Sequence, residues 1–468
     1  MRKIVVLLFI TVFACIMLSG CGILAPESDG TFEFKLNLDF KSYRVVGLSA
    51  DITEIVIPDT FGGLPVTAID NNAFYREEKI RNVTIPDSVT SIGDSAFLGC
   101  SGLVSVTFGK GLTSMGESAF YGCETIQFIE IPDTLTEIPK RAFYNCIRIR
   151  CIEIPESITK IGYEAFRGCE KIESVVMHEG VTVIDEAAFK FCERLSDVEI
   201  PKSVTEIQSD AFLRCGIEKV EISESVVIIG NTAFSECASL KSITVDENNK
   251  NYKSIDGNLY SKDGKTLILC APDRSENLLV IPDGVTTIEG YAFRGCNTEI
   301  VKLPDTLTTI EADAFLYSNL KRVVIPDSVT YVGNGAFKYS NALEEVVIGN
   351  GLTKLQRDVF CSCRNLRSVA IGDNVTEIDL RAFYGSNNLS ELVVGKGMKN
   401  IDPFMLYSAE NFKTVYYSGT EEDWNAISFT ERNTNKLLSA TRYYYSESKP
   451  TTDGRFWHYN SDKKPVAW

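Results

Sequence analysis

A short pattern of apolar and polar residues returns along most of the chain. Each copy begins with a segment of the form L-x-x-L-x-L, in which apolar residues alternate with polar ones, as at 103–108 and 320–325. Alternation with a period of two predicts a β-strand with one buried face. A turn follows, often Pro-Asp as at Pro86-Asp87, and proline ends the strand because it donates no ladder hydrogen bond. A second apolar segment of the form V-T-x-I, as at 89–92, predicts a short strand on the other side of the same coil.

A phenylalanine, almost always preceded by alanine, fixes the length of the repeat. The steps are 22 or 23 residues, and the series is Phe74, Phe97, Phe120, Phe143, Phe166, Phe189, Phe212, Phe234, and then Phe293, Phe315, Phe337, Phe360 and Phe383. A fixed period of this length predicts a solenoid, because one coil buries its apolar face only against its neighbours. We therefore expect a mostly β solenoid of about 13–14 coils with short helical turns, including a degenerate coil at Phe404. The rings expected in its core include Phe97, Phe120, Phe143, Phe166, Phe189, Phe212, Phe293 and Phe337.

The period breaks once, between Phe234 and Phe293. This stretch contains the dipeptides Asp256-Gly257 and Asp263-Gly264 between apolar runs. Asp-Gly between such runs is typical of tight β-turns, so residues 246–275 are expected to form a β-hairpin insert. The insert is interpreted as a spacer that bends or marks the solenoid.

The repeat resembles that of the BspA-type leucine-rich repeat proteins, a family of bacterial surface proteins. The matching residues include Ile85 to Gly93 (IPDSVTSIG) and Ala96 to Cys100 (AFLGC), and the resemblance extends over about residues 45–415. It implies a leucine-rich-repeat solenoid with an N-terminal cap at 32–67, repeats at 68–245 and 276–415, and a C-terminal cap at 416–468. It also implies a binding role, since the family is known mainly for adhesins that bind host proteins or other cells.

The N-terminus has the features of an export signal. Arg2 and Lys3 precede an apolar stretch from Ile4 to Leu18, which is shorter than the ~20 residues that span a bilayer. Leu18-Ser19-Gly20-Cys21 is similar to a bacterial lipobox, which implies lipidation of Cys21 and loss of residues 1–20, with 21–31 as a tether. The expected location is the extracellular face of the bacterial cell membrane. The alternative is an ordinary secretory signal in which Cys21 is incidental.

Composition argues against several function classes. The formal net charge is -16, and an acidic chain repels the phosphates of nucleic acid. The two histidines, His178 and His458, lie far apart, so a histidine-based catalytic or metal site is not expected. No nucleophile, zinc or phosphate-binding motif is present. We therefore expect no enzyme activity, no cofactor and no metal.

Nine cysteines follow the repeat phenylalanine by three residues: Cys100, Cys123, Cys146, Cys169, Cys192, Cys215, Cys237, Cys296 and Cys363. Disulfides or a string of metal ligands are one interpretation. A column of buried thiols, each bonded weakly to the backbone, is favoured because the cysteines follow the coil period and nothing pairs them. Cys151, Cys270 and Cys361 lie outside this column.

The C-terminal segment has a different, aromatic pattern. Thr420 and Asp423 predict a capping box at the start of a helix that carries Trp424. Residues 443–447, 455–459 and 465–468 predict three short strands. A cap that shields the last coil is the favoured interpretation. The alternative is a carbohydrate-binding or cell-wall-binding module.

The solvent-facing positions of the long strands are the candidate ligand sites. The fifth position of L-x-x-L-x-L supplies an acidic column with Glu130, Glu153, Glu199 and Glu221, and an apolar column with Val324, Val347 and Val393. Stacked like charges cost stability, and exposed apolar rows attract partners. The alternative is a solvated sheet whose acids are neutralised by Arg81, Arg150, Lys241, Lys321 and Arg367. The expected function is surface binding or adhesion to a protein or glycan on host or neighbouring cells; the alternative is a structural spacer or a cell-wall carbohydrate-binding protein.

Overall fold

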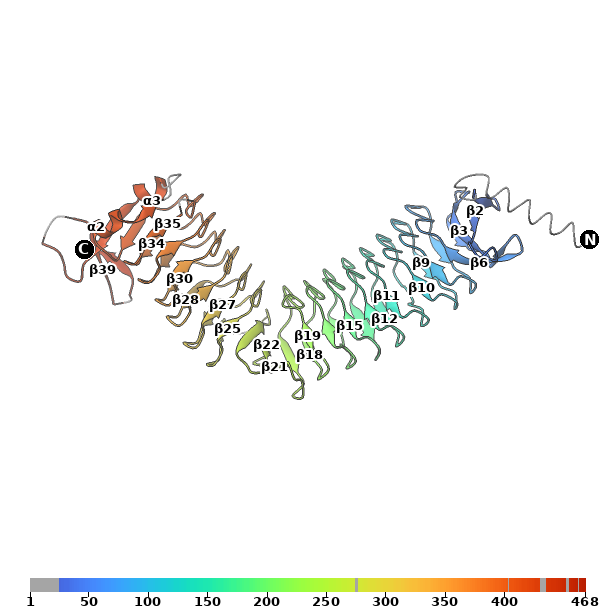
Figure 1. Ribbon diagram of the computed structural model, residues 1–468, viewed down its shortest axis with the longest axis horizontal. Helices are drawn as coiled ribbons and strands as arrows, with labels where there is room; N and C mark the ends of the chain where they lie inside the picture. The colour runs from blue at the N-terminus through green and yellow to red at the C-terminus, as the bar shows by residue number, and fades with distance from the viewer. Residues whose placement is uncertain (1–24, 274–276, 403, 430–434, 452–453, 462) are drawn as a thin grey trace, which may run out of the picture. The chain divides into compact units, whose positions relative to one another are not determined.

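The computed structural model describes residues 25–273, 277–402, 404–429, 435–451, 454–461 and 463–468. Over these residues the chain is a mostly β solenoid of about 17 turns, which confirms the fold class. It divides into two compact units: unit 1, which ends at Ile172, and unit 2, from Glu173 to Trp468. Within each unit, successive coils stack side by side (Figure 1). The expected signal segment 1–20 and the lipidation site Cys21 lie outside the described residues.

Unit 1 begins with an antiparallel meander that leads into the coils. Phe34 in this meander is fully buried and stacks on Phe61 at 4.1 Å between ring centroids. Residues 27–28, within the stretch that the sequence favours as a tether, pair with the next strand. The meander and the short strands after it form one sheet: β1 (Glu27–Ser28), β2 (Phe32–Leu36), β3 (Tyr43–Leu48), β5 (Thr60–Phe61), β6 (Leu64–Ile69), β8 (Ser91–Ile92) and β10 (Ser114–Met115).

Most coils of unit 1 supply a long strand and a short strand on different sides, but residues 126–131, which include Glu130, form no strand. The long strands are β4 (Glu54–Val56), β7 (Asn82–Thr84), β9 (Ser105–Thr107) and β12 (Cys151–Ile154). The remaining short strands, β11 (Glu137–Ile138) and β13 (Lys160–Ile161), pair in parallel. Paired residues of adjacent coils are 23 apart, as Val83 and Val106 are, so each position of the repeat forms a column.

Unit 2 continues the same pattern up to the insert. Its long strands are β14 (Ser174–Met177), β16 (Asp197–Val198), β18 (Lys219–Ile222) and β20 (Ser242–Val245), and its short strands are β15 (Val183–Ile184), β17 (Glu206–Ile207) and β19 (Ile228–Ile229). Strand β16 pairs with β14, whereas β18 pairs with β20 in a separate sheet. The long-strand surface is therefore divided between β16 and β18.

The insert is an antiparallel β-hairpin with a third strand, as the Asp-Gly dipeptides predict. Strands β21 (Tyr252–Ile255), β22 (Asn258–Ser261) and β23 (Thr266–Leu269) pair in sequence order. Asp256 and Gly257 both have positive φ, at 49° and 73°, as a type I′ turn requires. Strand β23 then pairs in parallel with the short strand β25 (Thr287–Ile288). The hairpin is therefore built into the stack of coils.

After the insert, one sheet of ten strands runs to the C-terminus. Its members are β24 (Leu278–Val280), β26 (Ile300–Lys302), β28 (Arg322–Ile325), β30 (Glu345–Ile348), β32 (Ser368–Ala370), β34 (Glu391–Val394), β36 (Thr414–Tyr417), β38 (Thr441–Tyr445), β39 (Phe456–Tyr459) and β40 (Pro465–Ala467). The short strands are β27 (Thr309–Ile310), β29 (Tyr331–Val332), β31 (Lys354–Leu355), β33 (Glu377–Ile378), β35 (Asn400–Ile401) and β37 (Ser428–Phe429). Helices α2 (Glu421–Asn425) and α3 (Asn435–Ser439) lie in the C-terminal segment.

The repeat phenylalanines point into the core and stack face to face. All thirteen rings are at most 1% exposed. In unit 1 the ring of Phe120 lies 5.0 Å from Phe97 and 5.6 Å from Phe143, with interplanar angles of 3° and 7°. In unit 2, Phe315 and Phe337 stack at 4.7 Å. The expected anchor Phe404 is an exception, because it is 36% exposed; Leu406 is buried one turn beyond Phe383 in its place.

The polar residues of the repeat join adjacent coils. Thr113 Oγ1 donates to the Thr90 carbonyl at 3.2 Å, which explains the threonine of V-T-x-I. The Asp87 carboxylate of Pro-Asp accepts the Lys110 amide at 2.8 Å. The Ala-Phe pair lies in a turn with i→i−3 bonds, such as Cys100 N to Phe97 O at 3.1 Å. Residues with positive φ, such as Ser95 and Gly99, flank this turn and keep it shorter than an α-helix.

The cysteine column follows the buried-thiol interpretation. In seven of the nine cysteines, Sγ donates to the carbonyl of the phenylalanine one coil earlier; Cys146 reaches Phe120 O at 3.2 Å and Cys363 reaches Phe337 O at 3.0 Å. Serine takes the same role at Ser340 and Ser386. The column therefore satisfies a carbonyl that faces the core, and either a thiol or a hydroxyl can fill this position.

Candidate binding surface

The long strands of each unit present one face to solvent, here called the strand face. In unit 1, Val83 and Val106 point inward, whereas Thr84 and Thr107 are exposed beside them. Glu130 and Glu153 are exposed at the same level of successive coils, which Arg150 N to Gln127 O joins at 3.4 Å. The structure therefore brings these two predicted site residues into one column.

The other two acidic candidates belong to unit 2 and are not in one ladder. Glu199 follows β16, and Glu221 lies in β18 opposite Thr244; β16 and β18 are in different sheets. Both carboxylates are exposed. Within the part of the chain that the structure describes, the side-chain carboxylates of Glu130, Glu199 and Glu221 form no ion pair or hydrogen bond.

Three of the basic residues of the strand face pair with acids other than the candidates. Lys241 contacts Glu218 at 2.8 Å and Lys321 contacts Glu299 at 2.6 Å. Arg367 reaches Glu344 at 3.9 Å. The neutralised sheet that the sequence offers as an alternative is therefore present at these second positions, but it does not include Glu130, Glu199 or Glu221.

The apolar column differs from the expectation at its C-terminal end. Val324 is exposed and Val347 is half-buried, but Val393 is only 2% exposed. Val393 pairs in register with Tyr416, whose ring stacks on Tyr443 and contacts Trp457. The expectation that Val393 lies on a binding surface is therefore wrong, because the aromatic C-terminal segment packs at that end of the column.

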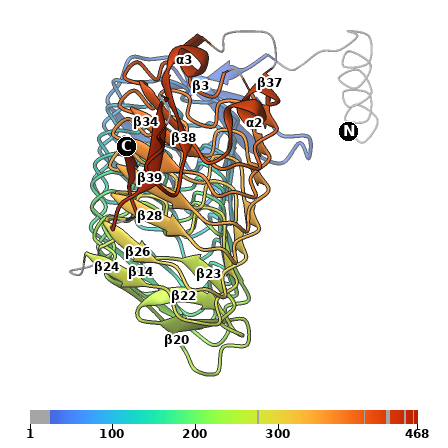
Figure 2. The same cartoon turned by 90° about the vertical axis from the view of Figure 1, so that its left-hand side faces the viewer.

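The same face contains an apolar cluster that the repeat count did not reveal. Leu278 and Val280 on β24 are each 49% exposed, Ile300 on β26 is 46% exposed and Val324 on β28 is 45% exposed. We call these four residues the β24 patch. Leu278 pairs with Ile300 and Val280 with Lys302, and Figure 2 shows the three strands next to one another. Strand β24 is also the terminal strand of its sheet.

Charged residues surround the β24 patch. Arg322 continues the column of Leu278 and Ile300 and pairs with Glu345 at 3.4 Å. Lys302 is exposed between Val280 and Val324. An apolar centre with charged neighbours is the composition expected of a protein-binding surface. The apolar runs Leu278-Leu279-Val280 and Ile300-Val301-Lys302 are visible in the sequence. Because the insert interrupts the repeat before β24, the sequence alone does not show which residues of these runs face solvent.

The Ala-Phe turns form a second face, here called the turn face, which is largely neutralised. In unit 1, the Glu164 carboxylate lies between Arg141, at 2.6 Å, and Arg167. Burial alone would raise the pKa of Glu164, but hydrogen bonds from Arg141 and Arg167 hold that pKa below its usual value. The charge of Glu164 is thus satisfied within the protein.

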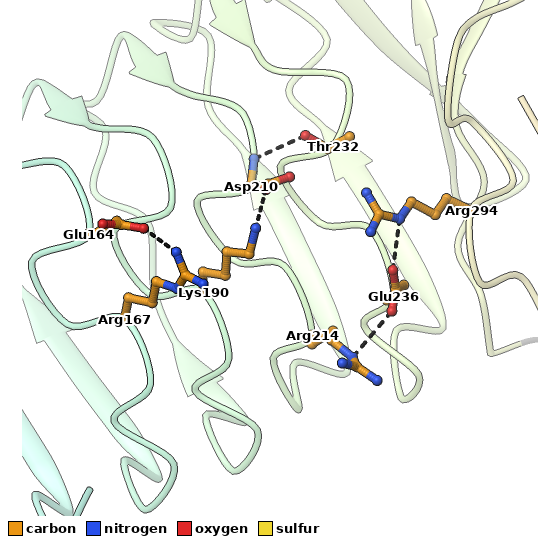
Figure 3. Close-up of polar contacts among 8 residues, drawn as sticks. All are labelled: Glu164, Arg167, Lys190, Asp210, Arg214, Thr232, Glu236 and Arg294. Carbon is orange, nitrogen blue, oxygen red and sulfur yellow. Dashed lines mark hydrogen bonds and ion pairs between the residues drawn. The ribbon is translucent and has the colours of Figure 1, made fainter. Parts of the chain in front are cut away.

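The turn face of unit 2 contains similar pairs (Figure 3). Lys190 contacts Asp210 at 2.6 Å. Glu236 accepts from Arg214 at 3.2 Å and from Arg294 at 2.7 Å. Arg294 follows the insert and Glu236 precedes it, so this pair joins the coils on its two sides. Because these charges serve the stack, a charged ligand finds few available partners among them.

The C-terminal segment buries its largest side chains. Thr420 and Asp423 form the predicted capping box of α2, and Trp424 is buried. Trp457 is fully buried and its Nε1 donates to the Tyr417 carbonyl at 2.9 Å. These contacts lie within residues 416–468, and β36 joins this segment to the preceding coil by pairing with β34. Tyr445, Tyr459 and Trp468 remain exposed at its surface.

Two other kinds of site are absent from the described residues. These residues contain no group of three or more His, Cys, Asp or Glu side chains placed to hold a metal ion. Nor does any helix among them have the length and apolar character needed to cross a bilayer.

Comparison with known proteins agrees with this architecture. A family model described as BspA type leucine-rich repeat region matches in six copies, over residues 67–194, 159–263, 274–390 and 334–441. The chain is similar to the crystal structure of a leucine-rich cell surface protein from Faecalibacterium prausnitzii, with 29% identity, a TM-score of 0.60, and coverage of 88% of this chain and 99% of that one. No curated protein matches the chain.

Two further solved structures align over most of the chain. The pneumococcal vaccine antigen PcpA is 20% identical, with a TM-score of 0.49 and coverage of 90% of this chain and 94% of that one. A leucine-rich repeat protein from Bacteroides ovatus is 20% identical, with a TM-score of 0.45 and coverage of 86% and 99%.

Proposed function

The chain belongs to the BspA-type leucine-rich repeat family, and from this we propose that it is a bacterial surface protein that binds a partner protein through its strand face, and that it acts by binding and not by catalysis. The β24 patch is the observation that carries the proposal. Single exposed apolar residues are normal, but here four lie together on three hydrogen-bonded strands.

The geometry of the patch favours an extended segment of a partner protein. The exposed side chains of the patch lie in rows on adjacent strands, so an extended partner strand can lie across them with alternate side chains in contact. Leu278 and Val280 then supply apolar contacts for the side chains of that strand. The neighbouring Lys302 and Arg322 add charge that orients an acidic partner segment.

Replacing Leu278 and Ile300 together by glutamate should reduce binding of the soluble protein by tenfold or more. Two charges in an apolar contact leave unpaired, desolvated carboxylates, and each costs well over about 1 kcal/mol. Binding would be measured on an array of host extracellular proteins and on whole cells. Melting curves of the variants would show that the coils still stack.

The matched control is Val227→Glu with Ile228→Glu, which adds the same charge at two exposed apolar residues, one directly before the short strand β19 and one in it. Equal loss in the control and the patch variant would show a general charge effect and overturn the proposed site. A second comparison is the double variant Glu130→Lys, Glu153→Lys, which reverses two charges of the acidic column. If only this variant loses binding, the binding site lies in the acidic column of unit 1. A ligand that proves to be a glycan would replace the protein partner.

We also propose that the chain is held at the membrane through a lipid on Cys21, since Leu18-Ser19-Gly20 precedes this cysteine. The lipid implied by the lipobox is a diacylglyceryl group, which has two acyl chains. Two chains hold a protein at the membrane far more stably than one, because each buried CH2 contributes about 0.8 kcal/mol. In the native host, most of the Cys21→Ser protein should be found either in the medium or as a precursor that keeps its signal segment. Little of it should be found as processed protein in the membrane fraction. Retention of a processed Cys21→Ser protein in the membrane fraction would reject lipid anchoring.

A further inference from the structure

Cys270 occupies the position of a repeat phenylalanine. In ordinary coils the phenylalanine amide donates to the alanine carbonyl of the next coil, as Phe293 N does to Ala314 O at 2.8 Å. Cys270 N donates to Ala292 O at 2.8 Å, although no Ala-Phe pair stands at this point in the sequence. The insert therefore contributes one coil to the stack in which a thiol replaces the phenyl ring.

This replacement brings two cysteines together. In ordinary coils a column cysteine lies against the carbonyl of the phenylalanine 26 residues earlier, as Cys363 does with Phe337. The residue 26 positions before Cys296 is Cys270, and the two sulfurs are 3.4 Å apart. Both residues are 1% exposed.

We propose that Cys270 and Cys296 form a disulfide that fastens the insert to the first coil of the second block of repeats. The sulfurs need to approach by about 1.4 Å to reach the bonded distance of about 2.05 Å. The oxidant is a small or protein-borne disulfide. One cysteine thiolate attacks it and releases one thiol; the second cysteine then attacks the mixed disulfide and releases the other thiol.

The overall exchange converts two cysteine thiols and one oxidant disulfide into one protein disulfide and two oxidant thiols. Burial of the two sulfurs determines when during folding this exchange can occur. Because neither sulfur is accessible in the folded coil, the exchange takes place during folding, before the second block packs on the insert. Seven other column thiols are expected to stay reduced, because each lies against a phenylalanine carbonyl at the place where Cys296 meets a second sulfur. The proposal does not depend on the proposed binding role.

Mass mapping of the refolded full chain tests the bond directly. The protein is refolded in a mixture of reduced and oxidised glutathione, unfolded in acid, alkylated and digested. We expect the Cys270 and Cys296 peptides to be joined, with two hydrogens fewer than the separate peptides, while Cys100, Cys123 and Cys146 carry the alkyl group. Alkylation of both Cys270 and Cys296, or linkage of either one to another cysteine, overturns the proposal.

Two variants separate the bond from a packing effect. Reduction should lower the melting temperature of unit 2 by about 5–10 °C, because the bond closes a loop of intermediate length. In Cys270→Ser, the oxidised and reduced proteins should have the same melting temperature, and Cys296 should be alkylated in the unfolded chain. Cys363→Ser is the matched control, because serine makes the same bond to a phenylalanine carbonyl at Ser340; it should leave the difference unchanged. Persistence of the difference in Cys270→Ser rejects the assignment.

Discussion

Replacing Phe120 by alanine should lower the free energy of unfolding of unit 1 by about 3–5 kcal/mol. The ring is fully buried and lies between Phe97 and Phe143 in the stack. Phe108 also meets it edge-on at 5.8 Å. Alanine removes the apolar contact and leaves a cavity that the neighbouring coils cannot close, because their spacing is set by backbone hydrogen bonds.

Guanidinium unfolding followed by circular dichroism, together with hydrogen exchange of the coil amides, would measure the effect. A solenoid unfolds coil by coil more readily than a globular domain, so the loss of protection should be largest in the coils of Phe97, Phe120 and Phe143. The control is Phe128→Ala, since Phe128 is 63% exposed in the same unit. A change of under about 1 kcal/mol for Phe120→Ala, or an equal change for Phe128→Ala, would contradict the stacked core.

The repeating part of the fold could be predicted from the sequence because each coil obeys the same local rules. Leucine or isoleucine at fixed positions gives the strands, and proline ends them. The phenylalanine then fixes the register, which the ring stack Phe97–Phe120–Phe143 reproduces. Buried thiols such as Cys146 followed from the same count, because a bond equivalent to that from Cys146 to Phe120 O is made in most cysteine-containing coils.

The residues that escaped prediction depend on contacts between distant segments. Val393 obeys the strand pattern, yet it is buried where Tyr416 and Trp457 come from a segment without the repeat. The β24 patch follows the insert, and the length of the insert does not show at which residue the 22–23-residue repeat resumes. Cys270 looks unrelated to the repeat, because only the bond to Ala292 O shows that it fills a phenylalanine position.

The two faces differ in a way that supports the proposed role of the strand face. On the turn face, Glu164 and Glu236 are each bound by two arginines, so their charges are used to hold coils together. On the strand face, Glu130 and Glu221 have no such partner among the described residues, and Leu278 and Val280 remain exposed. Surface that the stack does not use is the surface available to a partner.

The thiol column should make the solenoid lose stability steeply above pH 9. Burial raises the pKa of Cys100 and of Cys146 to about 12, whereas an unfolded thiol ionises near its ordinary value of 9.0. Between these pKa values the folded chain keeps protons that the unfolded chain has released, so the free energy of unfolding falls as pH rises. At pH 10.5 each such thiol accounts for a loss of about 2 kcal/mol relative to pH 8.

Guanidinium unfolding at pH 8 and at pH 10.5, with a reducing agent, would measure this loss. The double variant Cys100→Ser, Cys146→Ser should show a drop smaller than that of the unmodified chain by about 4 kcal/mol, because serine does not ionise and still donates to the phenylalanine carbonyl, as Ser340 does at 2.7 Å. Tyrosine and lysine titrate in the same range in both proteins, so the comparison isolates the thiols. Cys151→Ser, at an exposed position, should change nothing. Equal alkaline losses in the double variant and the unmodified chain would mean that the column thiols are not buried within the stack.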